Sequence, residues 1–304
     1  MKRSIEFKRN PISILLATFW QQELTASTMY QVQKNLRIRA GAFELQNGIR
    51  LRLGHEKEWI KYIRGQQLPN TSFVSKIEQL VPGSLRLRNH PLWEVCRLSP
   101  DEARIKAGYW FTQLPPAIAK RVLRKNNGKL IRRRFSQQML TVLENRCDLD
   151  GLTALCLLTL ESAGLGRGDL AIYAGAALFH SMLRLPFISP PYIAAIAPDL
   201  FELFQANIFP YAQSERKYLA VEQVDYKKLI QLIRLILEDY EKKYGSPDLP
   251  LLFEGFIRSG WVSPVGILNF QAPIVKKTSA SSQNDLTDWP KEWKTALQEW
   301  LSLQ

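Results

Sequence analysis

The chain has few of the side chains that usually bind metals. Only 3 histidines and 3 cysteines occur among its 304 residues. His55, His90 and His180 have no second histidine or cysteine nearby at the spacing of zinc ligands. The sequence therefore predicts no metal site. His180, on an apolar segment, is expected to be a hydrogen-bonded residue of the core, and His90 a hydrogen-bonded residue of a turn.

The sequence also lacks a cysteine pattern, a membrane span and a secretion signal. Its cysteines form no C-x-x-C pair, and their odd number leaves one thiol unpaired, which is typical of a reducing compartment. No apolar run approaches the ~20 residues that a membrane span needs. The apolar run near the N-terminus is short and is followed by Trp20 rather than by a small-residue cleavage site. We expect a cytoplasmic protein with no membrane segment.

Sequence motifs of common enzymes are missing as well. There is no phosphate-binding G-x-x-x-x-G-K-[ST] loop, and Gly164, Gly166 and Gly168 lack the spacing of the dinucleotide fingerprint. Asp148 and Asp150 stand before Gly151, but position twelve from Asp148 is not the glutamate of a calcium loop. We expect Asp150 to cap a helix. The sequence predicts neither a catalytic residue nor a cofactor, and an unrecognised enzyme is only the third alternative.

Positive charge is abundant and lies in one half of the chain. The net charge is +13. Residues 1–150 hold 27 Lys and Arg against 12 Asp and Glu, whereas residues 151–304 hold 14 against 16. This asymmetry favours a half that binds a polyanion, joined to a neutral half. A basic protein without such a partner is the alternative, because net charge also keeps proteins soluble.

Residues 54–84 are the most informative stretch. Spacings of three and four put Trp59, Tyr62 and Ile63 on an apolar face of a first helix. Gly65 is suited to end this helix with a left-handed backbone, and Asn70 is suited to cap the next one. The basic residues of the first helix fall on a different face: Lys57, Lys61 and Arg64.

The pattern Trp59-x-x-Tyr62-x-x-Gly65-x-x-x-Pro69 resembles the second half of a lambda-repressor-like helix-turn-helix domain. The resemblance covers residues 54–84 only. It implies that the helix before the glycine is a recognition helix. Its DNA-facing residues would be Lys57, Lys61 and Arg64, with Gln66 and Gln67 near the DNA backbone. Two ordinary core helices with a solvated basic face remain the alternative.

The segment upstream of this motif is ambiguous. Residues 11–36 have the pattern of a helix. Residues 36–53 alternate apolar and basic side chains around Asn47-Gly48, which is typical of two short strands or of a loop.

A second basic segment spans residues 120–134. Its Asn126-Asn127-Gly128 sequence is interpreted as a turn between two helices. Positive charges this close together repel one another, and phosphate is the expected partner because its neutralisation also releases counterions. A solvated face paired with acids elsewhere is the alternative. The eight candidate DNA-binding residues of this segment are Lys120, Arg121, Arg124, Lys125, Lys129, Arg132, Arg133 and Arg134.

The remainder of the chain has the pattern of a helical bundle. Two apolar helices are expected over 149–185, and an amphipathic helix over 224–244. Residues 274–288 form a polar, Ser-rich segment that is typical of a flexible linker. Residues 289–304 have the spacing of an amphipathic helix, expected to dock onto its own domain or to join a second copy or another protein.

The sequence as a whole predicts a mostly α-helical protein in four segments. Residues 1–110 form a helix-turn-helix-like DNA-binding module, and residues 111–273 form an irregular helical bundle that includes the basic segment 120–134. The linker and the C-terminal helix follow. The expected function is DNA binding, as a transcriptional regulator or a DNA-associated accessory protein. The alternative is a helical interaction or scaffold protein whose basic half binds RNA or an acidic protein.

Overall fold

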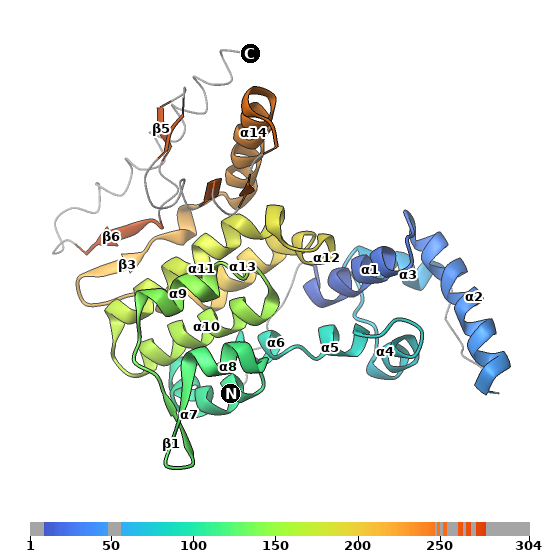
Figure 1. Cartoon of the computed structure of the whole chain (residues 1–304), viewed down its shortest axis with the longest axis horizontal. Helices are drawn as coiled ribbons and strands as arrows, with labels where there is room; N and C mark the ends of the chain where they lie inside the picture. Colours follow the sequence, from blue (N-terminus) through green and yellow to red (C-terminus); the bar gives the residue numbers. More distant parts are fainter. Residues whose placement is uncertain are drawn as a thin grey trace.

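The computed structural model describes residues 9–47, 56–246, 248–249, 252–253, 261–263, 266–268 and 272–277. The described chain is mostly helical, as the sequence predicts. An N-terminal lobe lies beside a larger helical body, and a two-stranded ribbon projects from that body (Figure 1). Buried apolar side chains form a single cluster that runs through both parts.

The N-terminal lobe is built around three aromatic rings. Its helices are α1 (Pro11–Glu23), α2 (Met29–Asn47), α3 (Glu56–Ile63), α4 (Thr71–Glu78) and α5 (Ser84–Arg88). The ring of Trp59 lies 5.4 Å from that of Trp20 and 5.4 Å from that of Phe73. The indole of Trp20 donates a hydrogen bond to the hydroxyl of Ser84. Trp59 is fully buried and Tyr62 nearly so, which confirms the apolar face predicted for this helix.

The turn after α3 also matches the sequence. Gly65 adopts a left-handed backbone with φ of 68°. A Cβ at this position would lie 2.9 Å from the backbone nitrogen of Asn10, so no other residue fits there without displacement. Asn70 caps α4 by accepting a hydrogen bond from the backbone N–H of Phe73 at 2.7 Å.

The segment upstream of α3 differs from the prediction. The single helix expected over 11–36 is two helices, α1 and α2, with a break at residues 24–28. The strand expected from residue 36 is wrong, because α2 continues to Asn47. Val32, Leu36 and Ala40 are buried at spacings of four, so the helical period decides the structure here. The rest of the expected hairpin, residues 48–53, lies outside the described residues.

Helix α10 (Leu149–Gly164) is the centre of the body. Every residue from Leu149 to Ser162 except Asp150 is buried, so the helix needs cover on all sides. This cover comes from α7 (Pro100–Thr112), α9 (Gln137–Glu144), α11 (Gly168–Ile188) and α6 (Pro91–Val95). The domain boundary expected at residue 110 falls inside α7, which packs against α10 and therefore belongs to the body.

The remaining helices and strands flank this core. They are α8 (Pro116–Val122), α12 (Pro191–Ala194), α13 (Ala197–Asn207), two 3₁₀ turns η1 (Phe209–Tyr211) and η2 (Val221–Gln223), α14 (Tyr226–Tyr244), and strands β3 (Lys217–Leu219), β4 (Trp261–Ser263) and β5 (Gly266–Leu268). Strand β4 pairs antiparallel with β5. The amphipathic helix expected over 224–244 is α14, which buries Leu229, Ile233 and Leu237.

The expected linker begins with a strand instead. Residues 274–276 form β6 (Ile274–Lys276), which pairs antiparallel with β3. The backbone N–H of Ala220 also donates to the carbonyl of Pro273 at 2.8 Å. The flexible linker is therefore wrong for these residues. The C-terminal helix expected over 289–304 lies outside the described residues.

Among the described helices, Gly168–Ile188 is long and apolar enough to cross a membrane. Within its most apolar window, 72% of the residues are buried inside the protein. The apolar surface of α11 is therefore covered by the protein itself, as in the core helix of a bundle.

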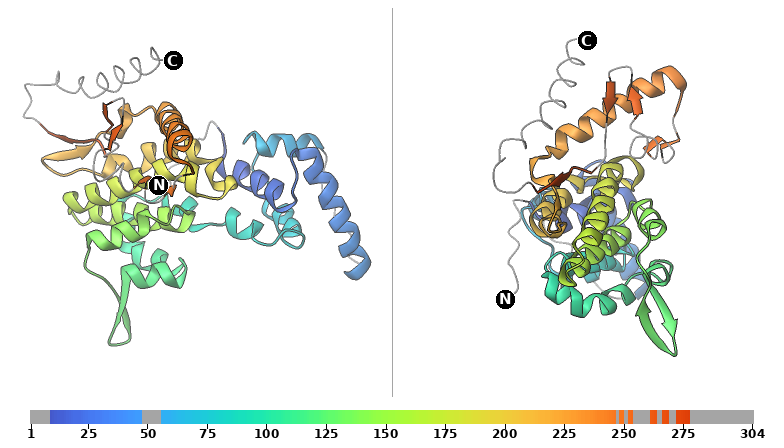
Figure 2. Two further views of the ribbon diagram at one scale, coloured as in Figure 1. Left: turned by 45° about the horizontal axis from the view of Figure 1, so that its top comes forward. Right: turned by 90° about the vertical axis from the view of Figure 1, so that its left-hand side faces the viewer.

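The basic segment is a β-ribbon and not a pair of helices. Strand β1 (Leu123–Asn126) pairs antiparallel with β2 (Lys129–Arg132). Asn127 and Gly128 form the turn, with φ of 46° and 78°. Two successive positive φ angles define the type I′ turn, whose twist matches that of the strands it connects. Figure 2 shows the ribbon standing out from the body in both views.

Candidate nucleic-acid interface

The ribbon grows directly out of helix α8. Val122 ends this helix and Leu123 begins β1, and both side chains are buried. On the return strand, the backbone N–H of Arg133 donates to the carbonyl of Val122 at 2.9 Å. The base of the ribbon is therefore part of the core, whereas Asn126, Asn127 and the rest of its tip are exposed.

Strand pairing sorts the ribbon side chains onto two faces. Leu123 is opposite Arg132, and Lys125 is opposite Leu130. Arg124 is opposite Ile131, and Asn126 is opposite Lys129. Opposed residues share a face and successive residues alternate. One face therefore carries Lys125 and Leu130 toward its tip, and the other carries Arg124, Asn126 and Lys129.

Arg132 fixes the ribbon to the body. Its guanidinium makes two hydrogen bonds with the carboxylate of Glu161, from Nε at 3.0 Å and 3.1 Å, and an ion pair from Nη2 at 2.9 Å. Nη1 donates to the carbonyl of Val122 at 2.7 Å, and the guanidinium lies 4.3 Å from the ring centre of Phe111. Its hydrogen-bonding capacity is largely used inside the protein. Arg132 is thus an anchor of the ribbon, and we remove it from the candidate contact residues.

Five other cations surround a cavity at the base of the ribbon. The cavity has a volume of about 660 Å³. Its lining includes Ser136, Gln138 and Met139 from the loop and helix that follow the ribbon, and it includes no acidic residue. Two other cavities, of about 970 Å³ and 600 Å³, each have two acidic residues in their lining. The cations around the basic cavity are Lys120, Arg121, Arg124, Arg133 and Arg134.

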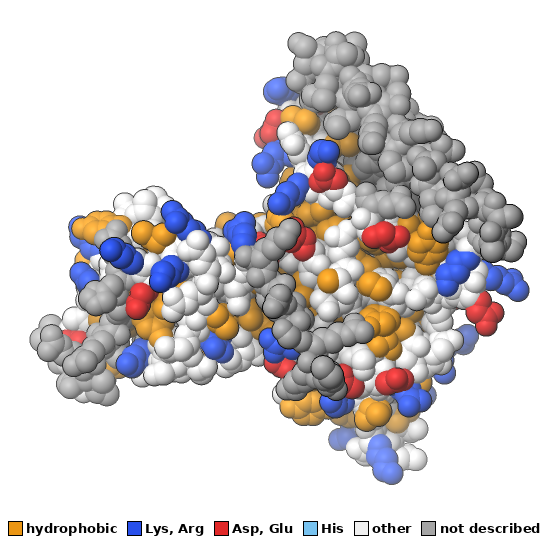
Figure 3. Space-filling view, turned by 180° about the vertical axis from the view of Figure 1, so that it is seen from behind, with side chains coloured by type: hydrophobic (Ala, Val, Ile, Leu, Met, Phe, Trp, Pro, Cys, Tyr) orange, Lys and Arg blue, Asp and Glu red, His pale blue; other side chains and the backbone are white. Residues whose placement is uncertain are grey.

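These cations have almost no acidic neighbours. Of the eight basic residues between 120 and 134, Arg132 alone forms an ion pair within the part of the chain that the structure describes. Arg133 uses Nε on the carbonyl of Leu123 at 3.0 Å and is otherwise exposed. The sequence left open that the cations of this segment are paired with acidic residues elsewhere. Within the described residues, this is true of Arg132 and of no other cation of the segment. Lys and Arg side chains are visible at the end of the molecule where the ribbon lies (Figure 3).

The other predicted contact residues lie on the N-terminal lobe. Lys57, Lys61 and Arg64 are all exposed, on the side of α3 that faces away from Trp59, and Ile63 is partly buried. The two residues that follow, Gln66 and Gln67, are exposed as well. Figures 1 and 2 show α3 and the ribbon in different parts of the molecule, so the structure does not bring the two basic segments together.

The segment that joins α2 to α3 cannot be compared with the turn of a helix-turn-helix, because residues 48–55 lie outside the described residues. The helix described before α3 has 19 residues. The resemblance of residues 54–84 to lambda-repressor-like domains therefore stays a prediction.

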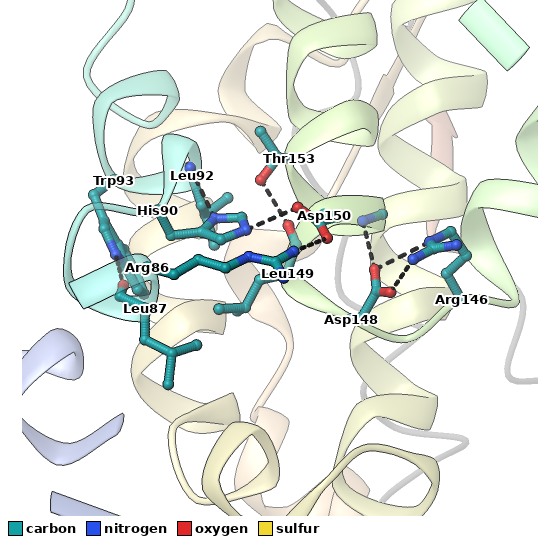
Figure 4. A network of polar contacts seen from close by, with 11 residues as sticks. Arg86, Leu87, His90, Leu92, Trp93, Arg146, Asp148, Leu149, Asp150 and Thr153 are labelled. Carbon is teal, nitrogen blue, oxygen red and sulfur yellow. Dashed lines mark hydrogen bonds and ion pairs between the residues drawn. The ribbon is translucent and has the colours of Figure 1, made fainter. Parts of the chain in front are cut away.

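His90, which caps α6, forms a buried polar contact with Asp150 in the first turn of α10 (Figure 4). His90 Nδ1 accepts from the backbone N–H of Leu92 at 3.2 Å, so Nε2 carries the proton and donates to Asp150 at 3.0 Å. Arg86 binds the other oxygen of Asp150 at 3.2 Å. Because both ring nitrogens are hydrogen-bonded, His90 is the hydrogen-bonded turn residue that the sequence predicts.

The aspartate that caps α10 is not the predicted one. The side chain of Asp148 accepts from the backbone N–H of Gly151 at 2.7 Å, which makes Asp148 the cap. Asp150 lies in the first turn and faces His90 instead. Burial raises the pKa of Asp150, but the hydrogen bond from His90 and the charges of Arg86 and Arg146 outweigh it. The pKa of Asp150 is therefore below its ordinary value.

His180 is bound inside the body. Its Nε2 accepts from the backbone N–H of Ala272 at 3.1 Å, and Nδ1 lies 3.8 Å from the carboxylate of Glu144. Burial raises the pKa of the neighbouring Cys147 thiol to about 11, so this cysteine is not a reactive thiolate. The described residues hold no group of three or more His, Cys, Asp or Glu side chains that could bind a metal ion.

Comparison with known proteins adds no family or fold to these observations. No family model, no curated protein and no solved structure matches this chain. The expected pair of helices around Asn126-Asn127-Gly128 is wrong, and the sequence prediction missed the ribbon, although Asn127-Gly128 is a strong hairpin signal.

Proposed function

We propose that this protein binds nucleic acid by holding its phosphate backbone against the ribbon base. The observation that carries the proposal is the cavity lined by five cations and no acid. Their mutual repulsion is unfavourable in the free protein, and a polyanion relieves it. Each neutralised phosphate also releases condensed counterions, which is the main source of nonspecific affinity.

The arrangement of the cations favours a backbone over a single small anion. Arg121 and Arg134 lie at the base of the ribbon, whereas Lys125 and Lys129 lie along it. A chain of phosphates can contact both groups at once, and one phosphate ion cannot. Such contacts position a protein on nucleic acid without reading its sequence.

The basic face of α3 is a second candidate contact. Lys57, Lys61 and Arg64 are exposed, and no ion pair involves any of them within the described residues. Its distance from the ribbon means that one short stretch of nucleic acid is not expected to satisfy both surfaces. It ranks below the ribbon because it offers three cations, whereas five surround the cavity at the ribbon base.

The test compares two variants that lose the same charge in different places. One replaces Lys120, Arg121, Arg124 and Arg134 by alanine. The matched control replaces four exposed cations of α14 by alanine: Lys227, Lys228, Arg234 and Lys242.

Binding to a short nucleic-acid duplex is measured by fluorescence anisotropy at one fixed salt concentration. The ribbon variant should lose most of the affinity, and the α14 control should keep it. Equal losses would show that only net charge matters and would contradict the proposed site. If the wild-type protein bound an acidic protein but no nucleic acid, the basic half would serve the alternative, protein-binding function.

A further inference from the structure

The length of the ribbon is matched to the depth of a nucleic-acid groove. Each strand has four residues, of which the three from 124 to 126 are exposed on β1, and at about 3.4 Å per residue these give roughly 10 Å before the turn is added. The major groove of B-form DNA is about 8.5 Å deep. With the basic cavity at the level of the phosphates, the exposed tip therefore reaches the groove floor.

The width of the ribbon distinguishes between the two grooves. A β-sheet together with its side chains is about 10 Å thick. The major groove of B-form DNA is about 12 Å wide and accepts a two-stranded ribbon, whereas the minor groove is only about 6 Å wide. Lys125 and Leu130 on one face and Arg124 and Lys129 on the other make this ribbon thick on both sides. It fits the major groove without distortion of the duplex.

The same dimensions distinguish DNA from duplex RNA. The A-form RNA helix has a deep, narrow major groove that side chains cannot read. A ribbon of this thickness would reach only the outer phosphates of such a helix. Single strands present no groove, and the ribbon carries no aromatic residue on which an unpaired base could stack.

The tip carries side chains that can contact base edges. Asn126 and Asn127 are exposed, and an asparagine amide pairs with the N6 and N7 atoms of adenine. Lys129 can donate to the O6 and N7 atoms of guanine. Leu130 is 57% exposed although it is apolar and sits in a strand, and the methyl group of thymine is an apolar surface in the same groove.

We propose that the ribbon enters the major groove of B-form DNA, with its tip on the base edges and the basic cavity on the adjacent phosphates. This inference rests on the proposed function, and it adds the class of nucleic acid and the groove. Arg132 fixes the base of the ribbon to the body through Glu161 and the carbonyl of Val122. The backbone of the ribbon is therefore already ordered before DNA binds.

The first experiment compares three ligands and two competitors with the intact chain. The ligands are a DNA duplex, the RNA duplex of the same sequence and the DNA single strand, at one salt concentration. The DNA duplex should bind about tenfold more tightly than either other ligand, the usual scale of one lost base contact. Methyl green, which occupies the major groove, should compete, and netropsin, which occupies the minor groove, should not.

The second experiment changes the tip and the groove. Asn127→Gly keeps the positive φ of the turn and removes the amide, Asn126→Ala removes the second amide, and Leu130→Thr keeps a β-forming side chain. The triple variant should bind DNA and RNA duplexes equally weakly, with its melting temperature unchanged. Duplex DNA made with 7-deazapurines, which lacks the N7 acceptors, should lose affinity for the wild-type protein only.

The outcomes separate this inference from the proposed function. Equal binding of the wild type to DNA and RNA duplexes, or competition by netropsin alone, would overturn the groove assignment and leave backbone binding intact. An unchanged affinity for 7-deazapurine DNA would likewise show that the tip does not read bases. Absence of binding to every nucleic acid would overturn both proposals.

Discussion

Replacement of Arg132 by alanine should destabilise the whole protein, although the residue lies in a highly basic segment. The side chain of Glu161 is 11% exposed and that of Arg132 is 28% exposed. Removal of one partner of a buried ion pair costs about 3–5 kcal/mol, because the remaining charge stays buried without compensation. The partial exposure of Arg132 puts the expected loss at the lower end, about 3 kcal/mol.

The measurement is thermal unfolding with a matched control. A loss of about 3 kcal/mol corresponds to a fall of roughly 6 °C in melting temperature for a domain of this size. Arg134→Ala removes the same charge two residues away from an exposed position and should leave the melting temperature within about 1 °C, the usual range for surface changes. Similar shifts for the two variants would refute the anchoring role.

A double variant tests the cause of this destabilisation. The combination of Arg132→Met with Glu161→Leu removes both charges of the ion pair, so no buried charge is left without a partner. Replacement of a buried ion pair by apolar residues is often neutral or stabilising, so the double variant should recover most of the stability lost in Arg132→Ala. Failure to recover would mean that the contacts of Arg132 with Val122 and Phe111 dominate instead.

Three further changes have defined outcomes. Trp59→Ala should cost about 3–5 kcal/mol in urea unfolding, because the indole is fully buried between two aromatic rings; an unchanged midpoint would contradict its core role. Asp150→Asn should lower the free energy of unfolding at neutral pH and weaken its pH dependence below about pH 4. The folded-state pKa of the Asp150 carboxyl is lowered, so the carboxylate stabilises the fold above its unfolded pKa. That stabilisation is lost as the pH falls through the folded-state pKa, and asparagine cannot provide it. An acid-unfolding curve identical to that of the wild type would exclude this. Joint replacement of Lys57, Lys61 and Arg64 by alanine should leave the melting temperature unchanged, and calorimetric titration with DNA then shows whether α3 contributes to affinity.

Local sequence patterns predicted helix ends and buried faces well where a single residue type determines them. Gly65 ends α3 in a left-handed conformation and Asn70 caps α4, as expected from their side chains. Trp59 and Tyr62 are buried at the predicted helical spacing. These features depend on neighbours within one or two turns, so the sequence contains the information directly.

Features that depend on distant partners were not predicted. Asp148 and Asp150 are both capable caps, and only the position of His90 shows which one faces the lobe. Strand β6 pairs with β3 across more than fifty residues of sequence. A strand of only three residues, Ile274–Lys276, is too short to show an alternating pattern of its own, and its hydrogen bonds are supplied by the partner strand.

The basic segment was misread for a different reason. The sequence predicts a turn between two helices over residues 120–134, and Lys and Arg are indeed good helix formers. The Asn127-Gly128 pair outweighs that propensity because its positive φ angles suit a type I′ turn. The role of Arg132 could not be predicted either, because Glu161 lies 29 residues further along the chain.

The salt dependence of DNA binding tests the central claim most directly. The slope of log affinity against log salt concentration is measured for the wild type and for the variant that lacks Lys120, Arg121, Arg124 and Arg134. Each lost phosphate contact should reduce the slope by roughly 0.9, so the two slopes should differ by about 3 to 4. Equal slopes would contradict phosphate binding at the ribbon base, whatever the affinities are.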